Sequence, residues 1–329
     1  MNKFKENAFE RRLTGPLEKK LLELTKTPTS WLSRWLSCEK QRPLLAIRNK
    51  YANLYVDGCA FKLCGGDGQL VFDANYLKRE TGLKNTLNKI SEPGTEYKIA
   101  SSDLTESLVQ DIVGAALEYQ AKGKRSKDKE RPLATRALQQ YAYSLDCEIG
   151  FPAISVNRAA ISMLQQYESE GKALPQYYFD LQYKERSSKK PDALLLSMSP
   201  KPTLRFFEIK EASNKEWSGD NPAVIHQARF YDCLLRNDKD SLCAAYKYVL
   251  RLFMKLGKHH AHFAPFASLD PESIDLLALD PFHDIVVIGD ITEAQRCDLE
   301  EKVKMQSVAN APHRRRVHVS SNAGDWLRS

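Results

Sequence analysis

Two apolar segments separated by a short turn constrain the fold of this chain more than any other feature. They cover residues 192–196 and 204–210, and two prolines, which favour turns, lie between them. Successive side chains of a strand point to opposite faces, so Glu208 and Lys210 would share one face. In a β-hairpin, Asp192 would lie close to that pair. The sequence therefore predicts a hairpin that brings two carboxylates and one ammonium together.

Charges gathered in this way need a partner when they are buried. Moving an ionised carboxylate out of water costs much free energy unless its charge is paired. A divalent cation supplies the opposite charge. Mg²⁺ is usually held by one or two carboxylates, several waters and substrate phosphates. Asp192 and Glu208 therefore predict a Mg²⁺ site with Lys210 beside it.

Pro191-Asp192 followed by Glu208-Ile209-Lys210 resembles the motif of the PD-(D/E)XK nuclease superfamily, which has the restriction-endonuclease-like fold. The resemblance covers roughly residues 155 to 295. It implies that Asp192, Glu208 and Lys210 are catalytic and that the two acids hold Mg²⁺, for which Mn²⁺ can substitute. It further implies that the main-chain carbonyl of Ile209 completes the metal site and that Lys210 orients or activates the attacking water.

The residues after Lys210 agree with this resemblance. Asp220 or Asn221 is a suitable helix N-cap before Pro222, and apolar residues then recur at helical spacing. Gln227 and Tyr231 stand one turn apart, like the glutamine and the aromatic residue that many of these nucleases carry after the lysine. We expect Gln227 to support the metal ligands or to contact a phosphate.

Two neighbouring features complete the expected core. Residues 284–289 predict a fully buried strand, as in a sheet covered by helices. The family often adds an acid from the helix before the first strand. The candidates are Glu130, Glu148, Glu168 and Glu170, but no spacing distinguishes one of them, and each is expected to be a solvated surface residue.

The predicted fold is α/β, with a restriction-endonuclease-like core in which helices flank a mixed central sheet. We expect this nuclease-like domain at residues 126–329, after an N-terminal α+β accessory module at residues 1–125. Short apolar runs between residues 44 and 72, separated by Asp57-Gly58 and by the glycine-rich residues 65–68, predict β-hairpins in that module. The boundary is expected in the highly charged stretch 121–132.

Three smaller features have no expected role in catalysis. Trp31 and Trp35 are expected to pack in a core rather than to stack on bases. The histidines between residues 259 and 262 are expected in an exposed loop rather than in a metal site. The basic cluster at residues 313–318 is expected to be a solvated surface that is also able to contact phosphate.

Composition excludes several classes of protein. The net charge of +7 and the pI of about 8.9 are compatible with a polyanionic partner. No apolar run is long enough for a transmembrane helix, and the charged N-terminus lacks the apolar segment of a secretory signal. The seven scattered cysteines indicate neither a disulfide framework nor a zinc site. We therefore expect a soluble, intracellular, cytoplasmic protein without membrane contact.

The sequence thus predicts a Mg²⁺-dependent endonuclease or exonuclease that hydrolyses phosphodiester bonds. DNA is the expected substrate rather than RNA, because most members of the superfamily cut DNA, which is an argument by analogy. Restriction, defence against phage or mobile elements, transposition and repair are all compatible roles, as are a homodimer or a partner subunit. Two alternatives stay open, namely a catalytically inactive nucleic-acid-binding module of the same fold and a ribonuclease.

Overall fold

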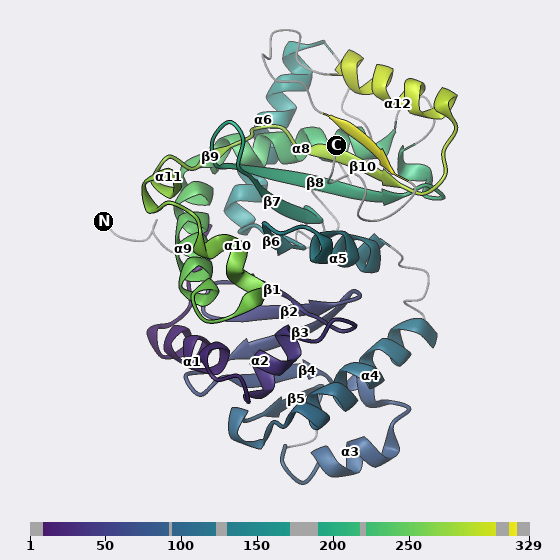
Figure 1. Ribbon diagram of the computed structural model, residues 1–329. Helices are drawn as coiled ribbons and strands as arrows, with labels where there is room; N and C mark the ends of the chain where they lie inside the picture. Colours follow the sequence, from purple (N-terminus) through teal and green to yellow (C-terminus); the bar gives the residue numbers. More distant parts are fainter. Residues whose placement is uncertain are drawn as a thin grey trace. The chain divides into compact units, whose positions relative to one another are not determined.

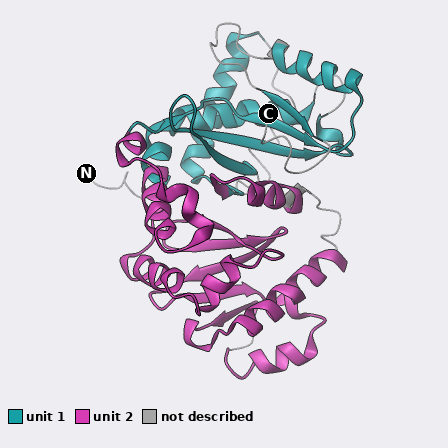
Figure 2. Cartoon of the chain, viewed as in Figure 1, with its two compact units in different colours: residues 1–10, 147–245, 276–329 teal, residues 11–146, 246–275 magenta. Residues whose placement is uncertain are grey.

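The computed structural model describes residues 9–91, 94–122, 130–171, 190–217, 222–306 and 316–320. The chain has a mixed α/β structure with two separate sheets (Figure 1). It divides into two compact units, each assembled from separate stretches of sequence (Figure 2). Unit 1 comprises residues 1–10, 147–245 and 276–329, and unit 2 comprises residues 11–146 and 246–275. The two predicted domains, 1–125 and 126–329, have other boundaries than these units, and the predicted domain boundary stays a prediction.

Unit 2 is built on a five-stranded antiparallel sheet in which neighbours in sequence are neighbours in space. Its strands are β1 (Leu44–Ile47), β2 (Ala52–Val56), β3 (Cys59–Cys64), β4 (Gln69–Asp73) and β5 (Glu96–Ile99). The first four strands confirm the predicted hairpins. Gly58 and Gly68 have φ angles of 81° and 75°, a conformation that glycine adopts without steric cost, so the chain can reverse tightly there.

Helices and short turns complete unit 2. They are α1 (Gly15–Lys26), α2 (Trp31–Leu36), α3 (Thr81–Leu87), α4 (Glu106–Lys122), α5 (Glu130–Gln140), α10 (Ala264–Ala267) and α11 (Pro271–Asp275), with 3₁₀ turns at η2 (Ala74–Leu77), η3 (Ser101–Asp103) and η6 (Ala261–Phe263). Trp31 and Trp35 are buried, and the Trp35 ring meets Phe61 of β3 edge-on at 5.3 Å between centroids. The predicted packing role of these tryptophans is confirmed.

Unit 1 contains the predicted hairpin as part of a mixed six-stranded sheet with the order β11-β10-β8-β7-β6, and β9 pairs with β8. The strands are β6 (Ser144–Cys147), β7 (Ala193–Ser197), β8 (Thr203–Glu211), β9 (Ala278–Leu279), β10 (Asp284–Ile288) and β11 (Val317–Ser320). Strands β7 and β8 are antiparallel, whereas β10 runs parallel to both β8 and β11. The chain passes from unit 2 to unit 1 within β6.

The helices of unit 1 are α6 (Ala153–Ser169), α8 (Ala223–Asn237) and α12 (Glu293–Gln306), with a 3₁₀ turn at η5 (Lys215–Trp217), while α9 (Lys239–Gly257) continues from unit 1 into unit 2. Helices α8 and α12 pack on the same face of the sheet (Figure 1), where Ile225 and Leu299 contact Ile285 and Val287 of the fully buried strand β10. Helix α6 packs along α8. The predicted α/β class with a mixed sheet is thus confirmed, and α8 buries one face of that sheet.

Three local features differ from what the sequence indicates. Helix α8 begins at Ala223 with Pro222 in the cap position, while Asp220 and Asn221 lie outside the described residues. The sequence between Leu133 and Leu145 reads as one helix, but helix α5 ends at Gln140, because residues from Ser144 onward join the sheet as β6. Strand β11 was not predicted, since its apolar and polar residues alternate over only four positions, which overlap the basic cluster. Half of that cluster, residues 313–315, lies outside the described part of the chain.

Candidate active site

The predicted site residues meet where β7 begins and β8 ends. Asp192 directly precedes β7, and its backbone N–H donates to the Phe207 carbonyl at 3.1 Å. Its side-chain Oδ2 accepts a hydrogen bond from the Ile209 N–H at 2.8 Å. These two bonds hold the Asp192 carboxylate beside the segment that contains Glu208 and Lys210, as the hairpin predicts.

The main-chain carbonyl of Ile209 lies on the same edge of β8. A strand residue directs its N–H and its C=O toward the same neighbouring strand. Since the Ile209 N–H donates to Asp192, its carbonyl also faces that side, just beyond the first residue of β7. The predicted carbonyl ligand is therefore on the edge of β8 that carries Asp192.

Glu208 and Lys210 form an ion pair on the face of the sheet that α8 covers. The distance between Lys210 Nζ and Glu208 Oε1 is 3.0 Å. Lys210 is only 5% exposed and Glu208 only 1%. Breaking such a buried pair by removing one member leaves an uncompensated charge, which costs about 3–5 kcal/mol. The ion pair therefore holds these two residues together even without a bound ligand.

Gln227 of α8 completes the environment of Glu208. Its Nε2 donates to Glu208 Oε1 at 2.5 Å and lies 3.2 Å from the Tyr231 hydroxyl. Both side chains are buried, and they come from adjacent turns of one helix face. Gln227 was expected either to support the metal ligands or to contact a phosphate. Its hydrogen bond to Glu208, a candidate metal ligand, corresponds to the first of these roles.

A second glutamate, which the sequence did not single out, also contacts Lys210. Glu216 lies in η5, its Oε2 is 2.9 Å from Lys210 Nζ, and its side chain is 41% exposed. The turn is fixed at both ends, because Asn214 Oδ1 accepts from the Glu216 N–H at 2.8 Å and the buried Trp217 donates to the Ala212 carbonyl at 3.0 Å. An Asn two residues before an acid and a tryptophan in a polar loop were the available signals.

The four candidates for a third acid differ in position. The backbone N–H of Glu148 donates to the Asp192 carbonyl at 3.2 Å, so this residue lies next to the site. Glu170 is 2.7 Å from Arg229 and is thus committed to another ion pair. Glu168 is exposed, and the side chain of Glu130 lies outside the described residues.

The oxygen donors of this site suit a small hard cation. Asp192 and Glu208 contribute two carboxylates, which is the usual protein share of a Mg²⁺ site, and the remaining ligands would be the Ile209 carbonyl, water and substrate oxygens. Among the described residues, no group of three or more His, Cys, Asp or Glu side chains is arranged to hold a metal ion. A cation at this position would therefore depend partly on substrate for its ligands.

The histidines that follow α9 serve packing in unit 2. His259 is exposed, but His260 is buried, which makes the prediction of an exposed loop wrong for that residue. The His260 Nε2 lies 3.0 Å from the Ser33 carbonyl and 3.2 Å from the Ser37 hydroxyl. These contacts dock the end of α9 on the residues of α2 without the need for a metal.

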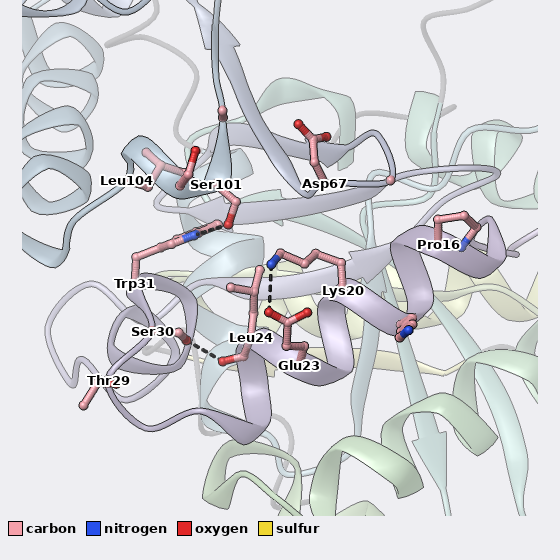
Figure 3. A pocket seen from close by; sticks show the side chains of 14 residues that line it. Pro16, Lys20, Glu23, Leu24, Thr29, Ser30, Trp31, Asp67, Ser101 and Leu104 are labelled. Atoms are coloured by element: carbon pink, nitrogen blue, oxygen red, sulfur yellow. Dashed lines mark hydrogen bonds and ion pairs between the residues drawn. The ribbon is translucent and has the colours of Figure 1, made fainter.

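Unit 2 also has an open pocket of about 630 Å³ beside α1, α2 and the turn after β3 (Figure 3). Several of its polar side chains form ion pairs or hydrogen bonds with one another. Lys20 pairs with Glu23 at 2.8 Å, and the Trp31 indole N–H donates to the Ser101 hydroxyl at 3.0 Å. None of the predicted site residues lines this pocket, and nothing in its chemistry selects a ligand.

No family model matches the chain, and neither a curated protein nor a solved structure is significantly similar to it. None of the helices in the described ranges is both long and apolar enough to cross a membrane.

Proposed function

We propose that this protein is a metal-dependent nuclease that hydrolyses phosphodiester bonds in DNA, with a restriction-endonuclease-like core. One observation carries the proposal, namely that the Ile209 N–H fixes Asp192 beside the buried Glu208–Lys210 pair on the β7–β8 hairpin. The proximity of the three residues of the PD-(D/E)XK-like motif on this hairpin supports the proposal. The support of Glu208 by Gln227 adds a fourth residue that matches the resemblance.

The charges of the site leave room for a divalent cation. Asp192, Glu208 and Glu216 carry three negative charges when ionised, and Lys210 carries one positive charge. The resulting charge of −2 is the one that a single divalent ion balances. A site of this charge would repel a phosphodiester on its own, so phosphate binding here requires a cation.

Each residue has a separate task in the proposed reaction. Asp192 and Glu208 would hold the cation through carboxylate oxygens, together with the Ile209 carbonyl. When bound, the cation neutralises charge on the scissile phosphate and lowers the pKa of a bound water. Lys210 orients the attacking water and donates to a phosphate oxygen, while Gln227 keeps the Glu208 carboxylate in place.

The distribution of charge supports a polyanionic substrate. Unit 2 contains 27 Lys and Arg against 19 Asp and Glu, whereas unit 1 contains 22 against 23. The whole basic excess of the chain therefore belongs to unit 2, outside the candidate active site. We propose that unit 2 supplies most contacts to the phosphate backbone, which carry affinity but no sequence information.

Cleavage of a panel of nucleic acids tests this function. The purified full chain is incubated with supercoiled plasmid, linear duplex DNA, single-stranded DNA and RNA, each with Mg²⁺, Mn²⁺ or EDTA. We expect metal-dependent cleavage of DNA by the wild type and by Glu301→Gln, a control at an exposed position of α12. Cleavage of RNA alone would identify a ribonuclease, and binding without cleavage in either metal would identify an inactive binding module. Both results contradict the proposal.

A further inference from the structure

The ammonium of Lys210 lies between two carboxylates that differ in their access to solvent. Glu208 is 1% exposed and approaches at 3.0 Å, whereas the Glu216 side chain is 41% exposed and approaches at 2.9 Å. Glu208 belongs to the same strand as Lys210, while Glu216 comes from the 3₁₀ turn that follows. The counter-charge of Glu208 is therefore part of the sheet, and that of Glu216 comes from a turn that is partly exposed to solvent.

We infer that Glu216 is a positioning residue that holds the Lys210 ammonium in the active site while Glu208 engages the cation. This inference rests on the proposed nuclease function and assigns a role to a residue outside the motif. It makes Glu216 act through Lys210 rather than on the substrate or the metal.

Glu208 has two tasks in the proposed site, because it pairs with Lys210 and also binds the cation. A carboxylate that coordinates a divalent cation has its charge largely neutralised and attracts a neighbouring ammonium less strongly. Lys210 is buried, and a buried ammonium without a counter-charge is strongly disfavoured. Glu216 supplies a second counter-charge, so Lys210 keeps its place when the cation binds.

The backbone around Glu216 is built to hold this position. Asn214 caps the turn through its bond to the Glu216 N–H, and the indole of Trp217 anchors the next residue to the Ala212 carbonyl. The preceding residues are tied to the sheet as well, since the Ala212 N–H donates to the Ile288 carbonyl of β10 at 2.8 Å. A side chain presented from a fixed turn loses less conformational entropy on pairing than one from a mobile loop.

A double-mutant cycle tests the coupling between the two residues. Single-turnover cleavage of DNA is measured at saturating Mg²⁺ for the wild type, Glu216→Gln, Lys210→Met and the double variant, with Glu301→Gln as the matched control. We expect Glu216→Gln to slow cleavage about 10–100-fold, the usual effect of removing a supporting partner of a site residue. In the Lys210→Met background the same change should have an effect of about twofold or less, because the two residues act together. Glu216→Asp should recover part of the rate.

Three results would overturn the inference. Glu216→Gln could cleave at the wild-type rate, it could slow both backgrounds equally, or its defect could disappear when the Mg²⁺ concentration is raised, which would make Glu216 a metal ligand.

If the wild type cleaves nothing, the proposed function fails instead. The positioning role then has its own readout in the ¹⁵N NMR signal of the Lys210 ammonium, identified by its loss in Lys210→Met. We expect Mg²⁺ to leave that signal in place in the wild type and to abolish it in Glu216→Gln, and identical behaviour of the two proteins contradicts the inference.

Discussion

Both units of this protein bury a carboxylate among polar partners, but they do so in different ways. In unit 2, Asp146 is fully buried, with Arg11 Nε at 3.1 Å, the Tyr246 hydroxyl at 2.6 Å, and Arg48 as a further partner. In unit 1, Glu208 is buried equally well between Lys210 and Gln227. Burial and pairing alone therefore do not separate the two clusters.

The difference lies in access to solvent. Every member of the Asp146 cluster is buried, and although burial itself raises the pKa of this carboxyl, Arg48 and Arg11 outweigh it and hold the pKa below its ordinary value. The Glu208 cluster, in contrast, borders Asp192 and Glu216, which are both partly exposed. We conclude that a closed set of charges stabilises the fold, whereas the set that opens to solvent is the candidate for chemistry.

The largest effect expected from this comparison concerns Lys210. Lys210→Met removes the group assigned to the attacking water, and loss of such a proton-transfer or water-orienting group typically slows a reaction about 10²–10⁴-fold. The measurement is the single-turnover rate of DNA cleavage at saturating Mg²⁺. The control is Lys304→Met at an exposed position of α12. Wild-type cleavage by Lys210→Met would break the assignment of chemistry to unit 1.

The second prediction concerns the closed cluster of unit 2. Asp146→Asn leaves Arg11 and Arg48 buried without their counter-charge, and removing one partner of a buried ion pair costs about 3–5 kcal/mol. Urea denaturation of the full chain, followed by circular dichroism, measures this loss. Asp111→Asn, at an exposed position of α4, should change stability by less than about 0.5 kcal/mol. A similarly small effect of Asp146→Asn would show that this cluster is not structural.

A smaller effect is expected from His226 of unit 1. Burial, with a lesser contribution from the charge of Arg229, lowers the pKa of His226 to about 4, and its Nδ1 lies 2.7 Å from the Tyr167 hydroxyl. Because the folded-state pKa lies below the unfolded value of 6.5, the folded protein favours the neutral ring. The stabilisation is complete above about pH 6.5 and falls as the pH decreases toward 4.

We expect this group to remove on the order of 2 kcal/mol of stability between pH 7 and pH 4, after allowance for solvent screening. The measurement is the free energy of unfolding at both pH values for the wild type and for His226→Gln, which cannot titrate. The wild type should lose more stability than the variant over this range. Equal losses in the two proteins would show that His226 titrates normally in the folded state.

The smallest effect tests the assignment of affinity to unit 2. Lys62 and Lys98 are exposed and pair with the same residue of β4, Val71, so they share one face of the sheet. The Lys62→Ala/Lys98→Ala double variant should reduce the slope of log K against log salt concentration by about 0.9 for each phosphate that these lysines neutralise. Lys304→Ala in unit 1 serves as the control. Equal salt slopes for all three proteins would mean that this face does not bind DNA.

The sequence predicted the strands of the site better than its complete set of side chains. The β7–β8 hairpin could be predicted because alternating apolar residues, the turn prolines and the acids all indicated the same arrangement. Glu216 could not be predicted from periodicity, since its contact with Lys210 depends on a short turn whose direction is set by Asn214 and by burial of Trp217. Local periodicity holds no information about such a turn.

Elements that depend on distant partners were also missed. Strand β6 begins in a segment whose local sequence favours a helix, because sheet pairing with a segment almost fifty residues away outweighs local preference. His260 appeared to belong to an exposed polar loop, yet Ser33 and Ser37, more than two hundred residues earlier in the chain, provide its hydrogen bonds. The division into discontinuous units follows the same logic, since residues 246–275 join the unit formed by residues 11–146.

The most direct test of the account is the removal and return of metal during plasmid cleavage. Supercoiled DNA is incubated with the wild type and with Asp192→Asn in Mg²⁺, in EDTA, and in EDTA followed by excess Mg²⁺, at equal occupancy of the DNA. The account predicts that wild-type cleavage stops in EDTA and returns with Mg²⁺, while Asp192→Asn is slower by about 10²-fold or more under all conditions that permit cleavage. Cleavage that continues in EDTA, or an Asp192→Asn variant as fast as the wild type, would contradict it.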